Sequence, residues 1–355
     1  MISSIVTQLV QCPDCSGGLA RADHAMVCTR CNRRFAASGG YLDLRPATDF
    51  TEQTKYLDHD LHADARHESI APPVLGSKIR NDMLRHFLRP GPDDRVVDLG
   101  CGSGRAIVWN ASSGASILGV DISPFFAAEA IEHADLILGD LRRLPLVDNA
   151  FDKAWSLDVM EHLSPQALHD VLTEASRVLA PGGALFIYTH VRKNGWPARG
   201  VRLVNQLAHG LERIGLVDLR QERLRKSDHL NPLTDHDHLH RVAADCGFRV
   251  ERVTYYSPII GAFMENVVAR MVERWLARRQ AQRLPATAAD ADASAPVRAA
   301  RKAAQAQVRR GGAVYWALRA ATGAMKLDLW LFGRIRTGPF FALLRKPPAG
   351  VEVRS

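Results

Sequence analysis

The chain has 355 residues, with 46% hydrophobic and 24% charged side chains, which is the composition of an ordinary globular protein of more than one domain. No apolar run reaches the ~18 residues of a membrane-spanning helix, so no such helix is predicted. A net charge of +8 favours an anionic partner, either nucleic acid or lipid headgroups. The first residues lack the basic segment and cleavage site of a secretory signal, which predicts a cytoplasmic protein.

Two C-x-x-C pairs begin the chain, Cys12 with Cys15 and Cys28 with Cys31. Four thiolates at this spacing can surround one Zn²⁺ tetrahedrally and leave no position for a substrate, which predicts a structural zinc ion. A redox C-x-x-C is the alternative, but two pairs without a βαβ context argue against it. Residues 1–45 are therefore predicted to form a zinc ribbon whose folding energy comes from the metal.

Residues 46–76 are polar and are predicted to form a linker. Four histidines in or near this segment lack a clean metal-ligand spacing: His24, His59, His62 and His67. After the linker, the spacing of apolar residues predicts a helix from Ser77 to Leu88. Pro90 and Pro92 then end this helix.

The sequence RVVDLGCGSG, residues 95–104, predicts a buried strand that breaks into a glycine loop before a helix opening at Arg105. Glycines allow a ligand to approach the backbone closely, and the helix offers free N–H groups. The third glycine comes one residue too early for the dinucleotide fingerprint G-x-G-x-x-G, and a P-loop G-K-[ST] is missing. Asp98 is placed to meet a cationic group of the ligand.

Two more apolar strands follow, and each ends in an acidic residue. Residues 116–123 contain Asp121, which lies about twenty residues beyond the glycine loop, where a carboxylate can accept hydrogen bonds from both ribose hydroxyls. Ser123 and Pro124 predict the start of the next helix. Residues 135–139 form the third strand, which ends at Asp140.

A fourth strand, from Lys153 to Val159, leads into Glu161 and His162, and a fifth strand is predicted from Ala184 to His190. Strands that alternate with helices in this way predict an α/β, doubly wound parallel sheet with helices on both faces. Ligands bind such sheets at the carboxyl ends of the strands, where all the acidic residues fall.

The ordered series DLGCGSG, VDIS, GDL, FDKAWSLDVMEHL and LAPGG resembles the motifs of the type 11 group of class I S-adenosylmethionine-dependent methyltransferases. The resemblance implies a Rossmann-like, seven-stranded sheet and S-adenosylmethionine as cofactor. It implies that Asp98 and the glycine loop hold the methionine part, that Asp121 holds the ribose, and that Asp140 lies against the adenine. The implied cofactor-binding residues are Asp98, Gly100, Cys101, Gly102, Gly104, Asp121, Ile122, Asp140, Leu141 and Leu157.

Methyl transfer to a hydroxyl needs a general base, whereas a carbon acceptor can do without one. His162 is the first candidate, because it follows the fourth strand at the cofactor-facing edge. Glu161 is a candidate to orient His162 or to pair with the substrate. His190 is the second candidate base and His229 the third; each of these residues could instead be a satisfied polar group at a strand end.

The second half of the chain departs from plain alternation. An apolar stripe at helical spacing, surrounded by arginines, lies where the family places a substrate cover: Leu203, Leu207, Leu211 and Ile214. An amphipathic surface helix is the alternative interpretation. A sixth strand opens at Gly247, and the seventh is predicted only at Pro339 to Arg345, after a long insertion.

The insertion, residues 261–337, combines basic faces with Trp-rich apolar faces, which suits a helix at a membrane interface. The alternative is a helical subdomain packed on the enzyme's own surface. RNA contact is a third option, but we expect the aromatic residues to be buried rather than interleaved with the charges for base stacking. Residues 286–295 are predicted to be a linker.

The sequence thus predicts five segments: a zinc ribbon (1–45), a linker (46–76), a methyltransferase core (77–260), a basic helical insertion (261–337), and the last core strand with the tail (338–355). The predicted function is methylation of a small-molecule or lipid-like acceptor at oxygen or carbon, by a cytoplasmic enzyme that touches the inner face of the membrane. The ribbon resembles those ahead of some ribosomal RNA guanine methyltransferases, so an RNA base methyltransferase is the alternative. A non-catalytic adaptor that binds partners is the second alternative.

Overall fold

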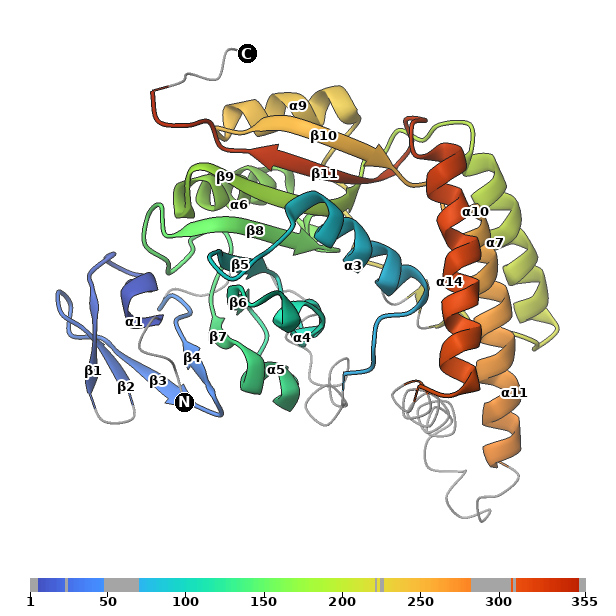
Figure 1. The fold of residues 1–355 in the computed structure, drawn as a ribbon, viewed down its shortest axis with the longest axis horizontal. Helices are drawn as coiled ribbons and strands as arrows, with labels where there is room; N and C mark the ends of the chain where they lie inside the picture. Colours follow the sequence, from blue (N-terminus) through green and yellow to red (C-terminus); the bar gives the residue numbers. More distant parts are fainter. Residues whose placement is uncertain are drawn as a thin grey trace.

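The computed structural model of the protein describes residues 6–22, 25–47, 70–220, 222–223, 227–281, 308 and 311–350. The four linker histidines and residues 286–295 lie outside the described residues. The strands are β1 (Leu19–Ala22), β2 (Ala25–Cys28), β3 (Arg34–Ser38), β4 (Tyr41–Asp43), β5 (Arg95–Leu99), β6 (Ser116–Asp121), β7 (Asp135–Leu138), β8 (Phe151–Leu157), β9 (Leu179–His190), β10 (Arg249–Tyr255) and β11 (Pro339–Arg345). Their spatial order is β1-β2-β3-β4-β7-β6-β5-β8-β9-β11-β10 (Figure 1).

The seven strands from β7 to β10 form the predicted Rossmann-like sheet. Strands β5 to β9 are parallel, and β11 lies antiparallel between β9 and β10. The chain starts in the middle at β5, builds outward to β7, and then crosses back to β8. The loops after β5 and β8 therefore leave in opposite directions and open a crevice at the carboxyl ends of the strands.

The helices are α1 (Val6–Leu9), α3 (Leu75–Leu88), α4 (Arg105–Asn110), α5 (Ala128–His133), α6 (Pro165–Val178), α7 (Ala198–Arg213), α9 (His236–Asp245), α10 (Ile259–Ala262), the π-helix η5 (Phe263–Ala269), α11 (Arg270–Ala281) and α14 (Ala313–Phe332), with short 3₁₀ turns η3 (Ala111–Ser113) and η4 (Met160–His162). Two apolar cores cover the two faces of the sheet. One core contains side chains of α6 and α9, and the other contains side chains of α3, α4 and α5. Alternate residues of β5 enter opposite cores, Val97 the first and Val96 the second, as a strand buried on both faces requires.

The cysteine-rich segment is continuous with the main sheet. Strand β4 pairs in parallel with β7, with Leu42 opposite Ile137. Val6 and Leu44 belong to the same core as α6 and α9. Burial against the sheet therefore adds to whatever energy a metal contributes to this segment.

The helix predicted to begin at Ser123 and Pro124 starts later, at Ala128. Asp121 Oδ1 accepts a hydrogen bond from the Ser123 N–H, which turns the chain directly after β6. The next residues, Phe125 and Phe126, are 4% and 3% exposed, because the non-helical segment directs both rings into the interior. The Ser-Pro prediction was wrong here because burial of two aromatic rings outweighs a local helix-start signal.

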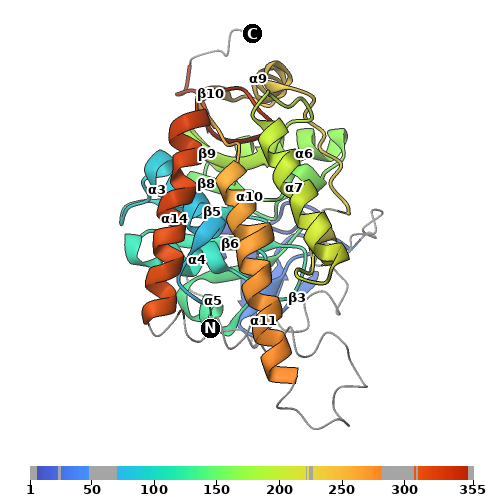
Figure 2. The ribbon, with the colours of Figure 1, turned by 90° about the vertical axis from the view of Figure 1, so that its right-hand side faces the viewer.

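Helices α7, α10–η5–α11 and α14 form a layer at the carboxyl ends of the parallel strands (Figures 1 and 2). Helix α14 is fixed to the core by polar contacts: the Thr322 hydroxyl accepts the Leu75 N–H at 2.8 Å, and Asp328 accepts the Ile260 and Gly261 N–H groups. The expectation that the aromatic residues are buried was wrong, since Trp316 is 66% exposed. Among the described residues, no helix is long and apolar enough to cross a membrane.

Candidate functional site

A pocket of about 1670 Å³ lies at the carboxyl ends of the parallel strands, between the sheet and helices α3, α7 and η5. The glycine loop, the turn after β8 and the end of β9 all contribute to its wall. Nine of the ten predicted cofactor-binding residues line it: Asp98, Gly100, Cys101, Gly102, Asp121, Ile122, Asp140, Leu141 and Leu157. The same pocket contains all the candidate bases, so cofactor and acceptor residues share one space.

The glycine loop is held in place by Asp121. Its Oδ2 accepts the Gly102 N–H at 2.7 Å. Gly102 has φ +55°, and a Cβ added there would have no atom within 4 Å, so its backbone is open to a ligand. Gly104 does not line the pocket; its φ is +82°, and a Cβ would lie 2.4 Å from the Ala130 Cβ. This third glycine therefore serves the packing of α4 against α5.

Asp98 is a buried carboxyl group at the floor of the pocket. It is 2% exposed, and its Oδ2 accepts no hydrogen bond from the described residues. Burial raises the pKa of Asp98 to about 7; the nearby Trp155 indole N–H acts to lower it, and the Asp121 carboxylate adds to the effect of burial. A buried carboxylate without a full set of partners is a site for a cationic ligand group.

Asp140 follows strand β7, and its carboxylate already has a partner. Its carboxylate is held by the Arg142 guanidinium, with the Nη2 atom 2.8 Å from Oδ2. The Arg142 backbone N–H also donates to Oδ1. A ligand amino group at Asp140 would therefore share the carboxylate with Arg142.

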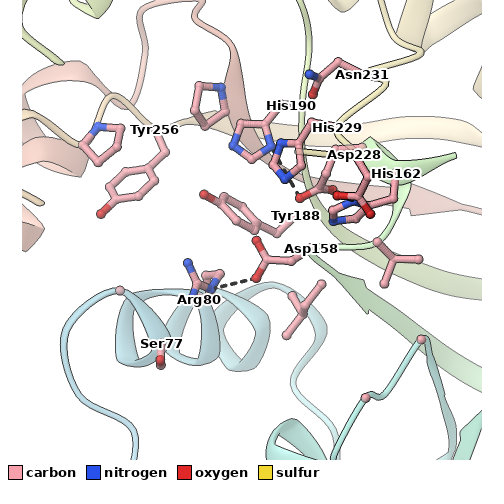
Figure 3. A pocket seen from close by; sticks show the side chains of 18 of the residues that line it. Ser77, Arg80, Asp158, His162, Tyr188, His190, Asp228, His229, Asn231 and Tyr256 are labelled. Carbon is pink, nitrogen blue, oxygen red and sulfur yellow. Dashed lines mark ion pairs between the residues drawn. The ribbon is translucent and has the colours of Figure 1, made fainter. Parts of the chain in front are cut away.

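The candidate catalytic side chains lie in two imidazole–carboxylate contacts at one end of the pocket (Figure 3). His162 Nδ1 lies 3.0 Å from Asp228 Oδ1. His190 Nδ1 lies 3.6 Å from Glu161 Oε1. Glu161 thus pairs with His190, and it is Asp228 that orients His162.

Glu161 is the buried centre of this cluster, at 1% exposure. Its Oε2 accepts the Thr189 hydroxyl at 2.9 Å. Burial acts to raise the pKa of Glu161, but the contact with His190 outweighs it and the pKa is lowered. The side chain is therefore an anion that fixes His190, with little capacity to act as a proton acceptor itself.

The loop that carries His229 is attached to the same turn. The Leu230 and Asn231 N–H groups donate to the Glu161 backbone carbonyl at 2.8 and 2.9 Å. The His229 ring stands edge-on to His162, with centroids 4.6 Å apart. Burial and the nearby His162 lower the pKa of His229, so this imidazole stays neutral at pH 7.

Residues 97–187 match the sequence profile of a family described as "Methyltransferase domain". This chain contains a methyltransferase domain. It is similar to the 24-methylenesterol C-methyltransferase 2 of Oryza sativa subsp. japonica, at 28% identity over 186 residues, covering 49% of this chain and 46% of the relative. It is also similar to an uncharacterized methyltransferase of Synechocystis, at 32% identity, covering 30% of this chain and 51% of the relative.

A third relative is the chloroplastic tocopherol O-methyltransferase of Arabidopsis thaliana, at 34% identity, covering 28% of this chain and 31% of the relative. The chain thus spans about half or less of the length of these relatives. The similarity identifies the domain, and the acceptor has to be argued from the pocket.

The pocket of the methyltransferase domain contains an ion pair that sequence reasoning missed. The Nε atom of Arg80, from α3, lies 3.2 Å from Asp158 Oδ2, and the Arg80 guanidinium lies over the Tyr188 ring (Figure 3). Asp158 has φ +57°, a left-handed conformation that is strained for a residue with a side chain. Arg80 and Asp158 are far apart in sequence, so only the fold reveals their pairing.

Three residues of the site also have the atoms of a metal site. The ligand atoms of Glu161, His162 and His229 lie within 4.8 Å of one another. Two of the three already have ionic partners in His190 and Asp228.

The four N-terminal cysteines converge on one point outside the methyltransferase domain. Their sulfur atoms all lie within 4.8 Å of one another, with Cys12 and Cys31 3.7 Å apart and Cys15 and Cys28 3.5 Å apart. Burial acts to raise the pKa of Cys28, but the backbone N–H groups of Cys31 and Arg30 lower it to about 6. None of the four forms a disulfide bond.

The buried Asp98 predicts a pH-dependent stability. Its pKa is about 7 in the folded state and about 3.9 in an unfolded chain, so its contribution to the free energy of unfolding is greatest below pH 4 and is lost as the pH rises to 7. We expect Asp98→Asn to be more stable than wild type by about 2–4 kcal/mol at pH 8, and the gap to close by pH 4.

Urea unfolding at a series of pH values measures this difference. The exposed Asp93, changed to Asn, is the matched control and should follow wild type at every pH. An Asp98→Asn variant that is equally stable or less stable at pH 8 would show that the carboxylate is solvated or paired.

Proposed function

We propose that this protein is an S-adenosylmethionine-dependent methyltransferase whose acceptor is a small molecule or a lipid-like compound, methylated at oxygen or carbon. The observation that carries the proposal is the single pocket that joins the glycine loop to the paired histidines. The acceptor class is supported by the sterol and tocopherol methyltransferases among the relatives.

The residues of the pocket fit the cofactor. When bound, S-adenosylmethionine supplies a methyl group on a sulfonium. The Asp98 carboxylate, with its unpartnered oxygen, would take the cofactor's amino group. The open backbone of Gly102 would face the methionine part, Asp121 would accept the ribose hydroxyls, and Asp140 with Leu141 would border the adenine.

The paired side chains would prepare the acceptor. Asp228 holds His162 through Nδ1, so Nε2 is the nitrogen that would take a proton from an acceptor hydroxyl. Glu161 fixes His190 beside the same space, where the imidazole would orient the acceptor. Holding both reactants in attack geometry can itself contribute ~7–11 kcal/mol to the lowering of the barrier.

We further propose that Cys12, Cys15, Cys28 and Cys31 bind one structural Zn²⁺. Four thiolates at ~2.3 Å from a tetrahedral ion lie ~3.8 Å apart, which is close to the 3.5 and 3.7 Å between the sulfur pairs. The ion would keep β4 in register on β7. Four cysteines held as metal ligands suit a reducing compartment, so we place the protein in the cytoplasm.

The zinc proposal predicts about one ion per chain in the purified protein, measured by mass spectrometry of the metal content. Cys28→Ser should lose the ion and lower the melting temperature, because one vertex of the tetrahedron is removed. Cys246→Ser, at a buried thiol remote from the cluster, is the control and should retain the metal. A zinc-free wild type with unchanged stability after chelation would contradict a structural ion.

Cofactor binding tests the proposed function. Calorimetry should give micromolar affinity for S-adenosylmethionine in wild type and no detectable binding in Asp121→Ala, because this carboxylate both meets the ribose and holds the Gly102 amide. Asp93→Ala, at an exposed carboxylate, is the control and should bind normally. A folded, zinc-loaded wild type that does not bind the cofactor would favour the non-catalytic adaptor.

A further inference from the structure

We propose that the outer face of the helical layer docks on an anionic lipid bilayer. We call this face, formed by α7, α11 and α14, the helical wall (Figure 2). The docking itself is independent of catalysis. Its consequence, that a lipid-borne acceptor is taken from the bilayer, rests on the proposed function.

The exposed large apolar side chains are confined to one part of the chain. Among the described residues there are fourteen, and all lie between positions 196 and 331. None belongs to the cysteine segment, to the sheet, or to α3, α4, α5, α6 or α9. They are Trp196, Leu203, Leu207, Ile214, Leu230, Phe263, Met271, Val272, Trp275, Val314, Trp316, Leu327, Trp330 and Leu331. A concentration of this kind marks an interaction surface.

Helix α14 has the reverse of the usual amphipathic arrangement. Val314 is exposed on another side of the first turn, but at 3.6 residues per turn the other four exposed large apolar residues of this helix fall within about 100° of arc. They are Trp316, Leu327, Trp330 and Leu331, and Trp330 is 80% exposed. The opposite arc faces the protein and contains the polar Thr322 and Asp328, which bond to backbone N–H groups. The helix thus turns its polar side chains toward the protein and its tryptophans away from it. This arrangement suits a helix whose exposed face contacts an apolar environment.

Helix α7 repeats the arrangement. Leu203, Leu207 and Ile214 share one face and are 67%, 49% and 69% exposed, whereas Ala208 on the inner side is fully buried. Three members of the stripe predicted from the sequence thus point outward, whereas Leu211 packs against the buried cluster around Ala208 and Val267. Two helices far apart in sequence therefore present apolar faces in the same layer (Figure 2).

The positive charge of the protein indicates that the helical wall would bind an anionic bilayer. Residues 261–337 contain 14 Lys and Arg against 5 Asp and Glu, a net charge of +9, whereas the whole chain carries +8. Within the described helices, α11 has a net charge of +3, α14 of +1 and α7 of +2. On α11 the Arg279 guanidinium lies 3.7 Å from the Trp275 ring centre, which combines a cation with an interfacial aromatic residue. Tryptophans flanked by arginines suit anionic headgroups.

The pocket reaches the inner side of the same helices. Ala198 and Val201 of α7, Ala262 of α10 and Ala269 of η5 line it. An acceptor that resides in the bilayer would therefore have a short path from the helical wall to the paired histidines. A protein docked in this way lies on the membrane surface, in keeping with helices that do not span it.

Vesicle flotation tests the docking. Wild type should float with vesicles of equal parts phosphatidylglycerol and phosphatidylcholine and remain unbound with phosphatidylcholine alone. The double variant Trp316→Ser, Trp330→Ser should lose at least tenfold in binding, and Trp316→Phe, Trp330→Phe should retain most of it. Arg278→Glu, Arg279→Glu should lose about tenfold, because each cation near the surface adds to the attraction.

Two controls separate docking from folding and catalysis. Arg34→Glu with Arg249→Glu reverses two exposed charges outside the helical wall and should leave flotation nearly unchanged. All variants should bind S-adenosylmethionine as wild type does, so a failure of the cofactor assay would not be confused with a failure of docking.

Four outcomes would overturn the proposal. The first is wild type that does not float with anionic vesicles, and the second is a Trp-to-Ser variant that floats equally well. The third is a stable wild-type dimer in analytical ultracentrifugation that the Trp-to-Ser variant abolishes, which would assign the wall to a second copy of this chain. Preferential binding of single-stranded RNA over vesicles would likewise assign it to nucleic acid.

Discussion

The carboxyl group of Asp98, held in the interior at the end of β5, is the constraint on which the rest of the site depends. Burial raises its pKa to about 7, so ionising it costs stability unless a cation is near. The surrounding structure keeps the carboxyl group in place. Strand β5 is paired with its parallel neighbours β6 and β8, and Asp121 accepts the Gly102 N–H in the loop that follows β5. A ligand with a positive charge would stabilise the ionised form of the Asp98 carboxyl group.

A second set of charges, at the other end of the pocket, is already paired. Glu161 fixes His190 and Asp228 orients His162, while the His229 loop is bonded to the Glu161 carbonyl. The two ends therefore differ: one holds a buried carboxyl group with a raised pKa, and the other holds imidazole–carboxylate pairs. Cofactor and acceptor would meet between them, at the edge where the strands end.

Much of this could be predicted from the sequence, because its signals are local. Apolar runs that end in Asp98, Asp121 and Asp140 mark the strands, and the glycines mark the loop. Asp158 and Arg80 could not be predicted, since only packing of α3 on the sheet brings them together. Asp228 directly precedes the candidate base His229, but nothing local indicates that it faces His162.

The differences between expectation and structure have physical causes as well. The glycine pattern is the same whether a glycine faces a ligand or a neighbouring helix, so the packing role of Gly104 became visible only beside Ala130. Helical periodicity shows that apolar residues share a face and leaves open whether that face points inward. The tryptophans of α14 were expected to be buried for this reason, and the polar anchors Thr322 and Asp328 are what turn them outward.

The most direct test of the central claim is transfer of a labelled methyl group from S-adenosylmethionine to cell extracts separated into lipid and RNA fractions. The account predicts label in the lipid fraction, and, for an acceptor hydroxyl, a rate lowered about 10²–10⁴-fold in His162→Ala but unchanged in His169→Ala, an exposed histidine on α6. Label in the RNA fraction alone, or in neither fraction with a protein that binds the cofactor, would contradict it.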